Sequence, residues 1–172
     1  MNVLIVKLSS LGDVVQTLPV LHDVHRQFPD APIDWAVEEA SADLVRRPAG
    51  VRRVLPVAER RWRHARWSAQ TREEILAHRD ALREVAYDAV LDCQGLVKSA
   101  WVARRARLAI GGFSATFGNA SELCSWEWPV RWLVQRPIPM PERIHAVART
   151  RLLAARALGY ESPQLLQEPA VY

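Results

Sequence analysis

The sequence predicts an α/β domain in which an open parallel sheet is covered by helices on both faces. Short apolar runs rich in β-branched residues alternate along the chain with segments whose apolar residues recur at helical spacing. The first run, residues 2–6, is almost entirely apolar, as in strands buried on both sides of a sheet. Strands joined by helical crossovers lie parallel and connect right-handedly, so one doubly covered sheet is expected.

The expected elements follow one another regularly. Strands are expected at residues 2–6, 33–37, 51–57, 87–91 and 108–110, and helices at 13–27, 41–47, 71–86, from 95 onward and at 142–158. Pro19 predicts a kink in the first helix or a late start of that helix. Thr71 and Glu74 have the spacing of a capping box, and Gly159 is expected to end the last helix.

A loop of small polar residues follows the first strand. In a parallel sheet such a loop lies at the carboxyl edge of the strands, where ligands bind. It offers the hydroxyls of Ser9 and Ser10, a glycine at position 12 that permits close backbone approach, and the carboxylate of Asp13. Asp13 at a helix start suits an N-terminal capping role. It equally suits a general base that faces the cleft, and the two roles are compatible.

The fourth expected strand brings a second polar corner to the same edge of the sheet. This corner contains Gln94 and Gly95, and the helix that begins there carries Lys98 in its first turns. A helix N-terminus with a lysine attracts anions. The alternative is that Lys98 is simply an exposed surface residue.

Residues 58–67 form a basic and aromatic segment. Four arginines, His64 and two tryptophans lie within these ten residues. A solvated basic turn whose tryptophans pack on the body would explain the composition. Arginines that clamp phosphates, beside tryptophans that stack on sugar or lie at a membrane surface, would explain it as well. Binding to single-stranded nucleic acid is a third explanation.

Four stretches carry a shared pattern in order and spacing. The first, residues 3–19, contains Lys-x-Ser-Ser-x-Gly-Asp, and the others are residues 34–39, 52–63 and 87–99. Together they resemble the lipopolysaccharide heptosyltransferase I family. The resemblance covers nearly all of residues 1–112 and resumes at about 141–160. Residues 113–136 depart from the family pattern, and no family residue is assigned there.

The resemblance implies the type B glycosyltransferase fold, in which two Rossmann-like halves face a cleft. Residues 1–160 would be the acceptor-binding half and residues 161–172 a tail or the start of a linker, with the carboxyl-terminal donor-binding half absent. The implied reaction transfers L-glycero-D-manno-heptose from ADP-heptose to Kdo of Kdo-lipid A during synthesis of the lipopolysaccharide inner core. It proceeds with inversion and without a metal or other cofactor. Without the donor half, the chain alone is expected to have little activity.

The resemblance also implies roles for individual residues. Asp13 would deprotonate the acceptor hydroxyl group. The acceptor would be bound by Lys7, Ser9, Ser10, Gly12, Arg60, Arg61, Arg63, Gln94 and Lys98, with His64, His145 and Arg149 as further candidates. His145 and Arg149 match a His-Ala-Val-x-Arg pattern of the family, for which a structural role is the alternative.

The composition fits a protein that handles acidic ligands. The net charge is +4, and the lysines are only Lys7 and Lys98, with arginines otherwise. Arginines bind phosphate in a bidentate manner. A GC-rich genome explains heavy arginine use equally well. No apolar run is long enough to span a bilayer, and no leader is recognisable. Cys93 and Cys124 lack metal-ligand spacing, so a reducing compartment is expected. With the resemblance, the expected location is cytoplasmic and peripheral on the inner membrane, with Kdo-lipid A as partner and no nucleic acid.

Two other classes of function remain open from the residues alone. One is a non-enzymatic, flavodoxin-like binding module, because a parallel α/β fold does not fix function. The other is a nucleic-acid-binding protein that uses the basic segment 58–67. The chain has no G-x-G-x-x-G pattern and no P-loop pattern, so dinucleotide or P-loop binding lacks its usual signature.

Overall fold

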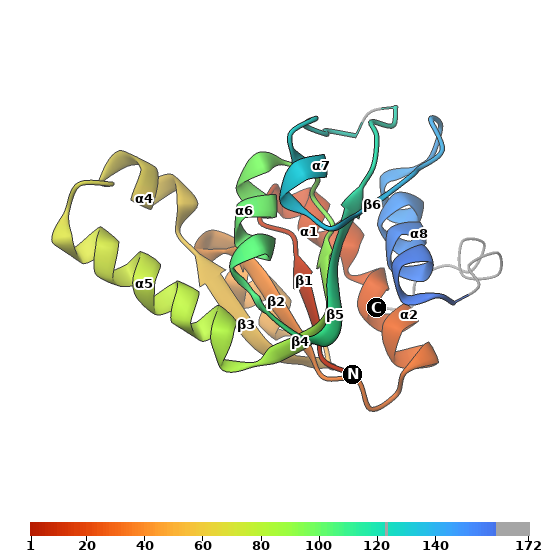
Figure 1. Ribbon diagram of the computed structural model, residues 1–172, viewed down its shortest axis with the longest axis horizontal. Coiled ribbons are helices and arrows are strands. Elements are labelled where there is room, and N and C mark those ends of the chain that lie inside the picture. The colour runs from red at the N-terminus through yellow and green to blue at the C-terminus, as the bar shows by residue number, and fades with distance from the viewer. Residues whose placement is uncertain (123, 161–172) are drawn as a thin grey trace.

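Six parallel strands form the central sheet, in the order β3-β2-β1-β4-β5-β6 (Figure 1). The computed structural model describes residues 1–122 and 124–160. The strands are β1 (Val3–Val6), β2 (Ile33–Glu38), β3 (Val51–Val57), β4 (Ala86–Asp92), β5 (Arg107–Phe117) and β6 (Arg136–Ile138). The strand order changes direction between β1 and β4, which is the switch point at which open α/β sheets bind ligands. The predicted open parallel sheet is confirmed.

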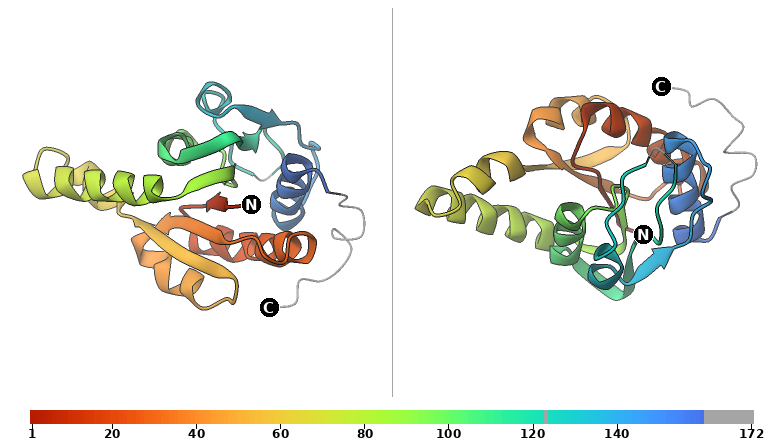
Figure 2. Two further views of the ribbon diagram at one scale, coloured as in Figure 1. Left: turned by 60° about the horizontal axis from the view of Figure 1, so that its bottom comes forward. Right: turned by 90° about the horizontal axis from the view of Figure 1, so that it is seen from above.

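Helices cover both faces of this sheet. They are α1 (Leu11–Thr17), α2 (Pro19–Gln27), α3 (Ala42–Arg46), α4 (Glu59–His64), α5 (Ala69–Glu84), α6 (Val97–Arg105), α7 (Val130–Leu133) and α8 (Ala146–Leu158), with a 3₁₀ turn, η1 (Glu39–Ser41), before α3. Helices α1, α2 and α8 pack on one face, and α5 and α6 pack on the other (Figure 2). The chain is therefore a three-layer sandwich, as the alternating pattern predicts.

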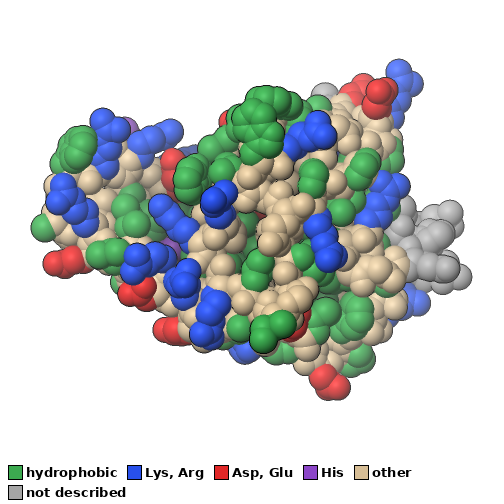
Figure 3. Space-filling view, in the orientation of Figure 1, with side chains coloured by type: hydrophobic (Ala, Val, Ile, Leu, Met, Phe, Trp, Pro, Cys, Tyr) green, Lys and Arg blue, Asp and Glu red, His purple; other side chains and the backbone are tan. Residues whose placement is uncertain are grey.

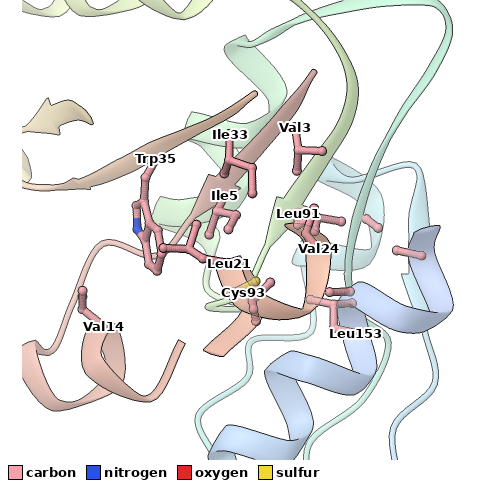
Figure 4. Close-up of a cluster of buried hydrophobic side chains, with 14 of the residues drawn as sticks. Val3, Ile5, Val14, Leu21, Val24, Ile33, Trp35, Leu91, Cys93 and Leu153 are labelled. Carbon is pink, nitrogen blue, oxygen red and sulfur yellow. The ribbon is translucent and has the colours of Figure 1, made fainter. Parts of the chain in front are cut away.

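The central strand β1 is buried on both sides. Val3 and Ile5 face α2 and α8 (Figure 4). Leu4 and Val6 point the other way, toward α5 and α6, because successive strand residues alternate. Each of the four is 0% exposed, and full burial of such a side chain stabilises a fold by about 1.5–3 kcal/mol. This burial fixes the position of the loop that follows β1.

The first helical region differs from the single kinked helix expected at 13–27. It is two helices that meet at Leu18, and Pro19 is the first residue of α2. A proline has no N–H to donate and is well tolerated at a helix start. The capping box expected at Thr71 is wrong. Helix α5 begins earlier, and its N-cap is Ser68, whose Oγ accepts a hydrogen bond from the Thr71 backbone N–H at 3.0 Å.

The last strand region is longer than expected. Strand β5 continues through residues 111 and 112 to Phe117, whereas the expected strand ended at residue 110. Gly111 has a φ of +79°, and a side chain at Gly112 would lie 2.5 Å from the Tyr87 carbonyl oxygen. The two glycines form an irregularity within the strand and do not end it. Strand β6 was not expected, since three residues give no measurable alternation.

Helices α4 and α5 form a helical arm that extends away from the sheet (Figure 1). The segment 58–67, expected as a surface turn, contains α4. Trp62 of α4 ties the arm together: its Nε1 donates to Glu74 of α5 at 2.8 Å, and its ring meets the His78 ring edge-on at 5.6 Å. His78 is 9% exposed, and its Nε2 has no hydrogen-bond partner in the described part of the chain.

His78 predicts a pH dependence of stability. Burial, together with the nearby Arg105 charge, lowers the pKa of His78 to about 4. The unfolded chain then binds more protons than the folded chain between about pH 6.5 and 4, so protonation favours unfolding. We expect the free energy of unfolding to fall by about 2–3 kcal/mol across that window.

The measurement is denaturant unfolding at several pH values, for the parent chain and for His78→Leu. The variant should lose this part of the pH dependence. An unchanged pH profile in the variant would contradict the assignment. His22→Leu is the matched control, because His22 is exposed on α2.

Two buried carboxylates hold elements that are distant in sequence. Asp23 of α2 and Arg151 of α8 form a bidentate ion pair at 2.6 and 2.8 Å, with side chains 1% and 6% exposed. Asp34 of β2 accepts hydrogen bonds from Arg52, Arg53 and Tyr87. Burial alone would raise the pKa of Asp34, but these hydrogen bonds outweigh it and hold the pKa below its ordinary value. Both groups stabilise helix and strand packing away from the carboxyl edge.

Candidate functional site

A cavity of about 470 Å³ lies at the carboxyl ends of β1 and β4. Its walls are the loop after β1, the start of α1, the corner after β4, the segment before α7 and the start of α8. The lining residues are Lys7, Ser9, Ser10, Asp13, Gln16, Thr17, Cys93, Gln94, Leu96, Phe117, Glu122, Cys124, Ser125, Ile144, His145, Ala146, Arg149 and Thr150. The cavity therefore occupies the switch point of the sheet, as the strand order predicts.

Asp13 lies in the first turn of α1 and also lines the cavity. Its Oδ2 accepts hydrogen bonds from the backbone N–H of Ser10 at 2.9 Å and from the Ser10 hydroxyl at 3.2 Å. The carboxylate thus satisfies a donor that a helix start leaves open. The capping role and the position in the cavity coexist in one geometry. Its role as a general base stays a prediction.

Gln94 positions the loop after β1. Its Oε1 accepts hydrogen bonds from the backbone N–H groups of Leu8 at 2.8 Å and Ser9 at 3.3 Å. Gln94 follows β4, and the two N–H groups that donate to it follow β1. One side chain therefore connects the ends of the two strands. Lys98 of α6 supports the same loop from the other side, since its Nζ donates to the Ser9 hydroxyl at 3.0 Å.

Replacing Gln94 tests this positioning role. Gln94→Ala leaves two backbone N–H groups without their acceptor, which should lower the free energy of unfolding by about 1–3 kcal/mol. Gln94→Glu keeps an acceptor oxygen and should retain most of the stability. Urea unfolding measures both. Gln70→Ala, which removes an exposed side-chain contact to Glu74, is the matched control and should change stability by less than about 0.5 kcal/mol. Equal effects at the two positions would contradict the role.

Lys7 is a buried cation in the cavity wall. Its side chain is 9% exposed, and its Nζ donates to the Cys93 carbonyl oxygen at 3.1 Å. Burial lowers the pKa of Lys7, and the nearby Asp13 carboxylate opposes that shift. Lys7 therefore places a cationic side chain in the cavity wall, close to the Asp13 carboxylate.

Arg149 is a second buried cation in the same cavity. It is 3% exposed, stacks over the Phe117 ring at 3.8 Å, and donates from Nη2 to the Asn119 carbonyl oxygen at 2.9 Å. Its Nε has no hydrogen-bond partner among the described residues, and burial lowers the pKa of Arg149. A buried guanidinium with an unused donor favours an anionic ligand. His145 lies one turn earlier as the N-cap of α8, where its Nδ1 accepts from the Val147 N–H.

Asp92 supports the site from beneath; the sequence placed it at this edge of the sheet but gave it no role. The carboxylate is 0% exposed and accepts hydrogen bonds from the Gln94 and Gly95 N–H groups and from the Thr116 hydroxyl. Burial raises the pKa of Asp92, and these donors oppose the shift. The signal in the sequence was an aspartate at the end of a strand, two residues before Gln94-Gly95, where the chain turns. Glu122, Cys124 and Ser125 were missed, because they lie in the stretch 113–136 that departs from the resembling pattern.

Six predicted binding residues do not line the cavity: Gly12, Lys98, Arg60, Arg61, Arg63 and His64. Arg60, Arg61, Arg63 and His64 are exposed on α4. Arg61 is paired with Glu39 at 3.2 Å and Glu74 at 2.5 Å. Gly12 is exposed in α1, and a side chain added there would meet no protein atom within 4 Å, so its part in acceptor binding stays a prediction.

The described residues contain no group of three or more His, Cys, Asp or Glu side chains arranged to hold a metal. No helix in the described ranges has the length and hydropathy to cross a bilayer.

Comparison with known proteins places this fold in a class. The solved structure of E. coli heptosyltransferase WaaC with ADP is similar with a TM-score of 0.85 and 44% identity, covering 95% of this chain and 49% of that one. E. coli ADP-heptose lps heptosyltransferase II shares the fold, with a TM-score of 0.69 at 19% identity, covering 100% of this chain and 45% of that one. The architecture is that of the amino-terminal half of a type B glycosyltransferase.

Sequence comparison gives the family. Glycosyltransferase family 9 (heptosyltransferase) matches residues 75–171, more than half of the chain. Lipopolysaccharide heptosyltransferase 1 of Escherichia coli K12 is 45% identical, covering 99% of this chain and 52% of that protein. The Pseudomonas aeruginosa protein of the same name is 42% identical, covering 95% and 44%. The chain belongs to glycosyltransferase family 9, and it spans about half the length of the curated relatives that it matches.

Proposed function

We propose that residues 1–160 are the acceptor-binding domain of a heptosyltransferase that transfers heptose from ADP-heptose to Kdo of Kdo-lipid A. One observation carries the proposal: a carboxylate, Asp13, and two buried cations, Lys7 and Arg149, line one cavity at the switch point of the sheet. A sugar acid that accepts a glycosyl group needs a base for its hydroxyl and a cation for its carboxylate. The 42–45% identity to lipopolysaccharide heptosyltransferase 1 proteins supports this substrate class.

In the proposed reaction Asp13 removes the proton from the acceptor hydroxyl group. The freed oxygen attacks the anomeric carbon of the heptose from the face opposite ADP. The bond to ADP breaks, and its electron pair leaves with the diphosphate, so the configuration inverts. Lys7 and Arg149 hold the acidic acceptor, and the Ser9–Ser10 loop, positioned by Gln94, lies beside the reacting oxygen.

The exposed arginines of α4 extend this proposal to the rest of the acceptor. Arg60, Arg61 and Arg63 lie on one short helix outside the cavity. Guanidinium groups bind phosphates in a bidentate manner, so they would contact the phosphorylated part of the acceptor. The acyl chains of lipid A keep the acceptor in a bilayer, so the chain would work peripherally at the cytoplasmic face of the inner membrane.

A chimaera tests the function. Residues 1–160 replace the matching amino-terminal part of E. coli lipopolysaccharide heptosyltransferase 1, and transfer from ADP-heptose to Kdo-lipid A is measured. The chimaera should turn over. A folded chimaera that binds ADP-heptose yet transfers nothing would contradict the proposal. Binding of Kdo-containing acceptor to the 172-residue chain is the second readout, and it should weaken in Arg149→Met.

A further inference from the structure

An exposed pair of tryptophans stands beside the cavity. Trp128 and Trp132 are 53% and 69% exposed, and their rings contact each other edge-on at 4.2 Å. Trp128 lies just before α7, and Trp132 lies within it. Helix α7 packs against α6 through the small core of Ala100, Val130 and Val134. Figure 3 shows hydrophobic side chains gathered over α7, with basic side chains around them and acidic ones toward the margins of this face. We call Trp128, Arg131 and Trp132 the α7 patch.

The neighbouring Trp126 shows that the exposure is not a general property of this segment. Trp126 is half-buried, and its Nε1 donates to the Phe117 carbonyl oxygen at 2.9 Å. The nearby Trp128 and Trp132 are exposed instead, although hydrogen bonds hold the backbone of this segment in place. The Glu127 N–H donates to the Gly95 carbonyl oxygen at 2.9 Å, and the Glu127 carboxylate accepts from the Val97 N–H at 2.6 Å. A rigid support therefore presents the two indole rings to solvent.

The stretch of chain that contains α7 and its neighbour α6 has more basic than acidic residues. Residues 96–138 contain Lys98, Arg104, Arg105, Arg107, Arg131 and Arg136, against Glu122 and Glu127. Arg104, Arg105 and Arg131 are exposed, and the Glu127 carboxylate is already bound to the N-terminus of α6. Trp101 of α6 adds a further indole that is 49% exposed. Exposed tryptophans among arginines match the headgroup region of an anionic bilayer, where indole rings and cations are both favoured.

We propose that the α7 patch docks the protein on an anionic lipid bilayer by inserting Trp128 and Trp132 among the headgroups. Cys124 and Ser125 line the cavity only a few residues before Trp128, so docking would hold the mouth of the cavity near the lipid surface. This docking surface deepens the membrane part of the proposed function and rests on it, but its test is separate from heptose transfer, because lipid vesicles without Kdo-lipid A suffice to detect docking.

Vesicle flotation of the 172-residue chain tests the proposal. Vesicles of phosphatidylcholine alone are compared with vesicles of phosphatidylcholine and phosphatidylglycerol in equal parts. The parent chain should bind only the anionic vesicles. The double variant Trp128→Ser/Trp132→Ser should bind at least about tenfold more weakly, through loss of buried apolar area, and Arg131→Gln about fivefold more weakly.

Trp67→Ser is the matched control. Trp67 is 75% exposed but follows α4, on the helical arm, and its variant should bind vesicles as the parent does. Loss of binding in Trp67→Ser with none in the double variant would overturn the proposal in favour of the arm. A chain that ignores anionic vesicles would also overturn it. So would a dimer in light scattering that the double variant dissociates, since the patch would then be an interface between two copies. Thermal unfolding of each variant confirms that it is folded.

Discussion

Asp13→Asn should reduce heptose transfer by a factor of about 10²–10⁴, the usual contribution of a positioned general base. The measurement is turnover by the chimaera that carries residues 1–160. The amide oxygen of asparagine can still accept from the Ser10 N–H, which is 2.9 Å from the carboxylate in the parent. Folding and acceptor binding should therefore survive, and the loss should appear in kcat more than in KM.

Asp43→Asn is the matched control for this change. Asp43 also lies in the first turn of a short helix, α3, and pairs with the exposed Arg46, but it does not line the cavity. It should leave turnover near the parent value. Near-normal turnover by Asp13→Asn would reduce Asp13 to a capping residue and remove the chemistry from the proposed site.

Breaking the buried ion pair between α2 and α8 should cause the largest loss of stability. Arg151→Met leaves the Asp23 carboxylate 1% exposed without its bidentate partner. An uncompensated buried charge of this kind costs about 3–5 kcal/mol. The free energy of unfolding, measured by urea titration, should fall by that amount.

The double variant Asp23→Leu/Arg151→Met distinguishes charge from packing. With both charges removed, an apolar pair of similar size should recover most of the loss, because the desolvation penalty disappears for both groups. Arg46→Met is the control, since it breaks an exposed pair and should cost less than about 1 kcal/mol. A double variant as unstable as Arg151→Met would show that shape, not charge, sets the effect.

The parts of the fold that depend on local pattern were predictable. The run at β1 is apolar on both faces, and the small polar loop after it is typical of the carboxyl edge. Pro19 correctly marked a break in the first helical region. The position of Gln94 near that loop followed from parallel strands sharing one edge.

Other features depend on contacts between residues far apart in sequence. The hydrogen bonds from Leu8 and Ser9 to Gln94 join residues 86 and 85 positions apart, and no local period reports them. Helix α4 has almost no apolar face, so its arginine-rich sequence was compatible with a surface turn. Arginine is seldom buried, so the sequence alone gave no reason to stack the Arg149 guanidinium over the Phe117 ring.

The hydrogen bond between Asp13 and Ser10 links proton transfer to the shape of the loop. A carboxylate binds an N–H group more strongly than a neutral acid does, because its negative charge assists the bond. In the proposed reaction Asp13 would take up a proton from the acceptor, and the first turn of α1 would then lose part of its anchor. The Ser9–Ser10 loop should then be held less tightly to α1 after each turnover, which would help the glycosylated product to leave.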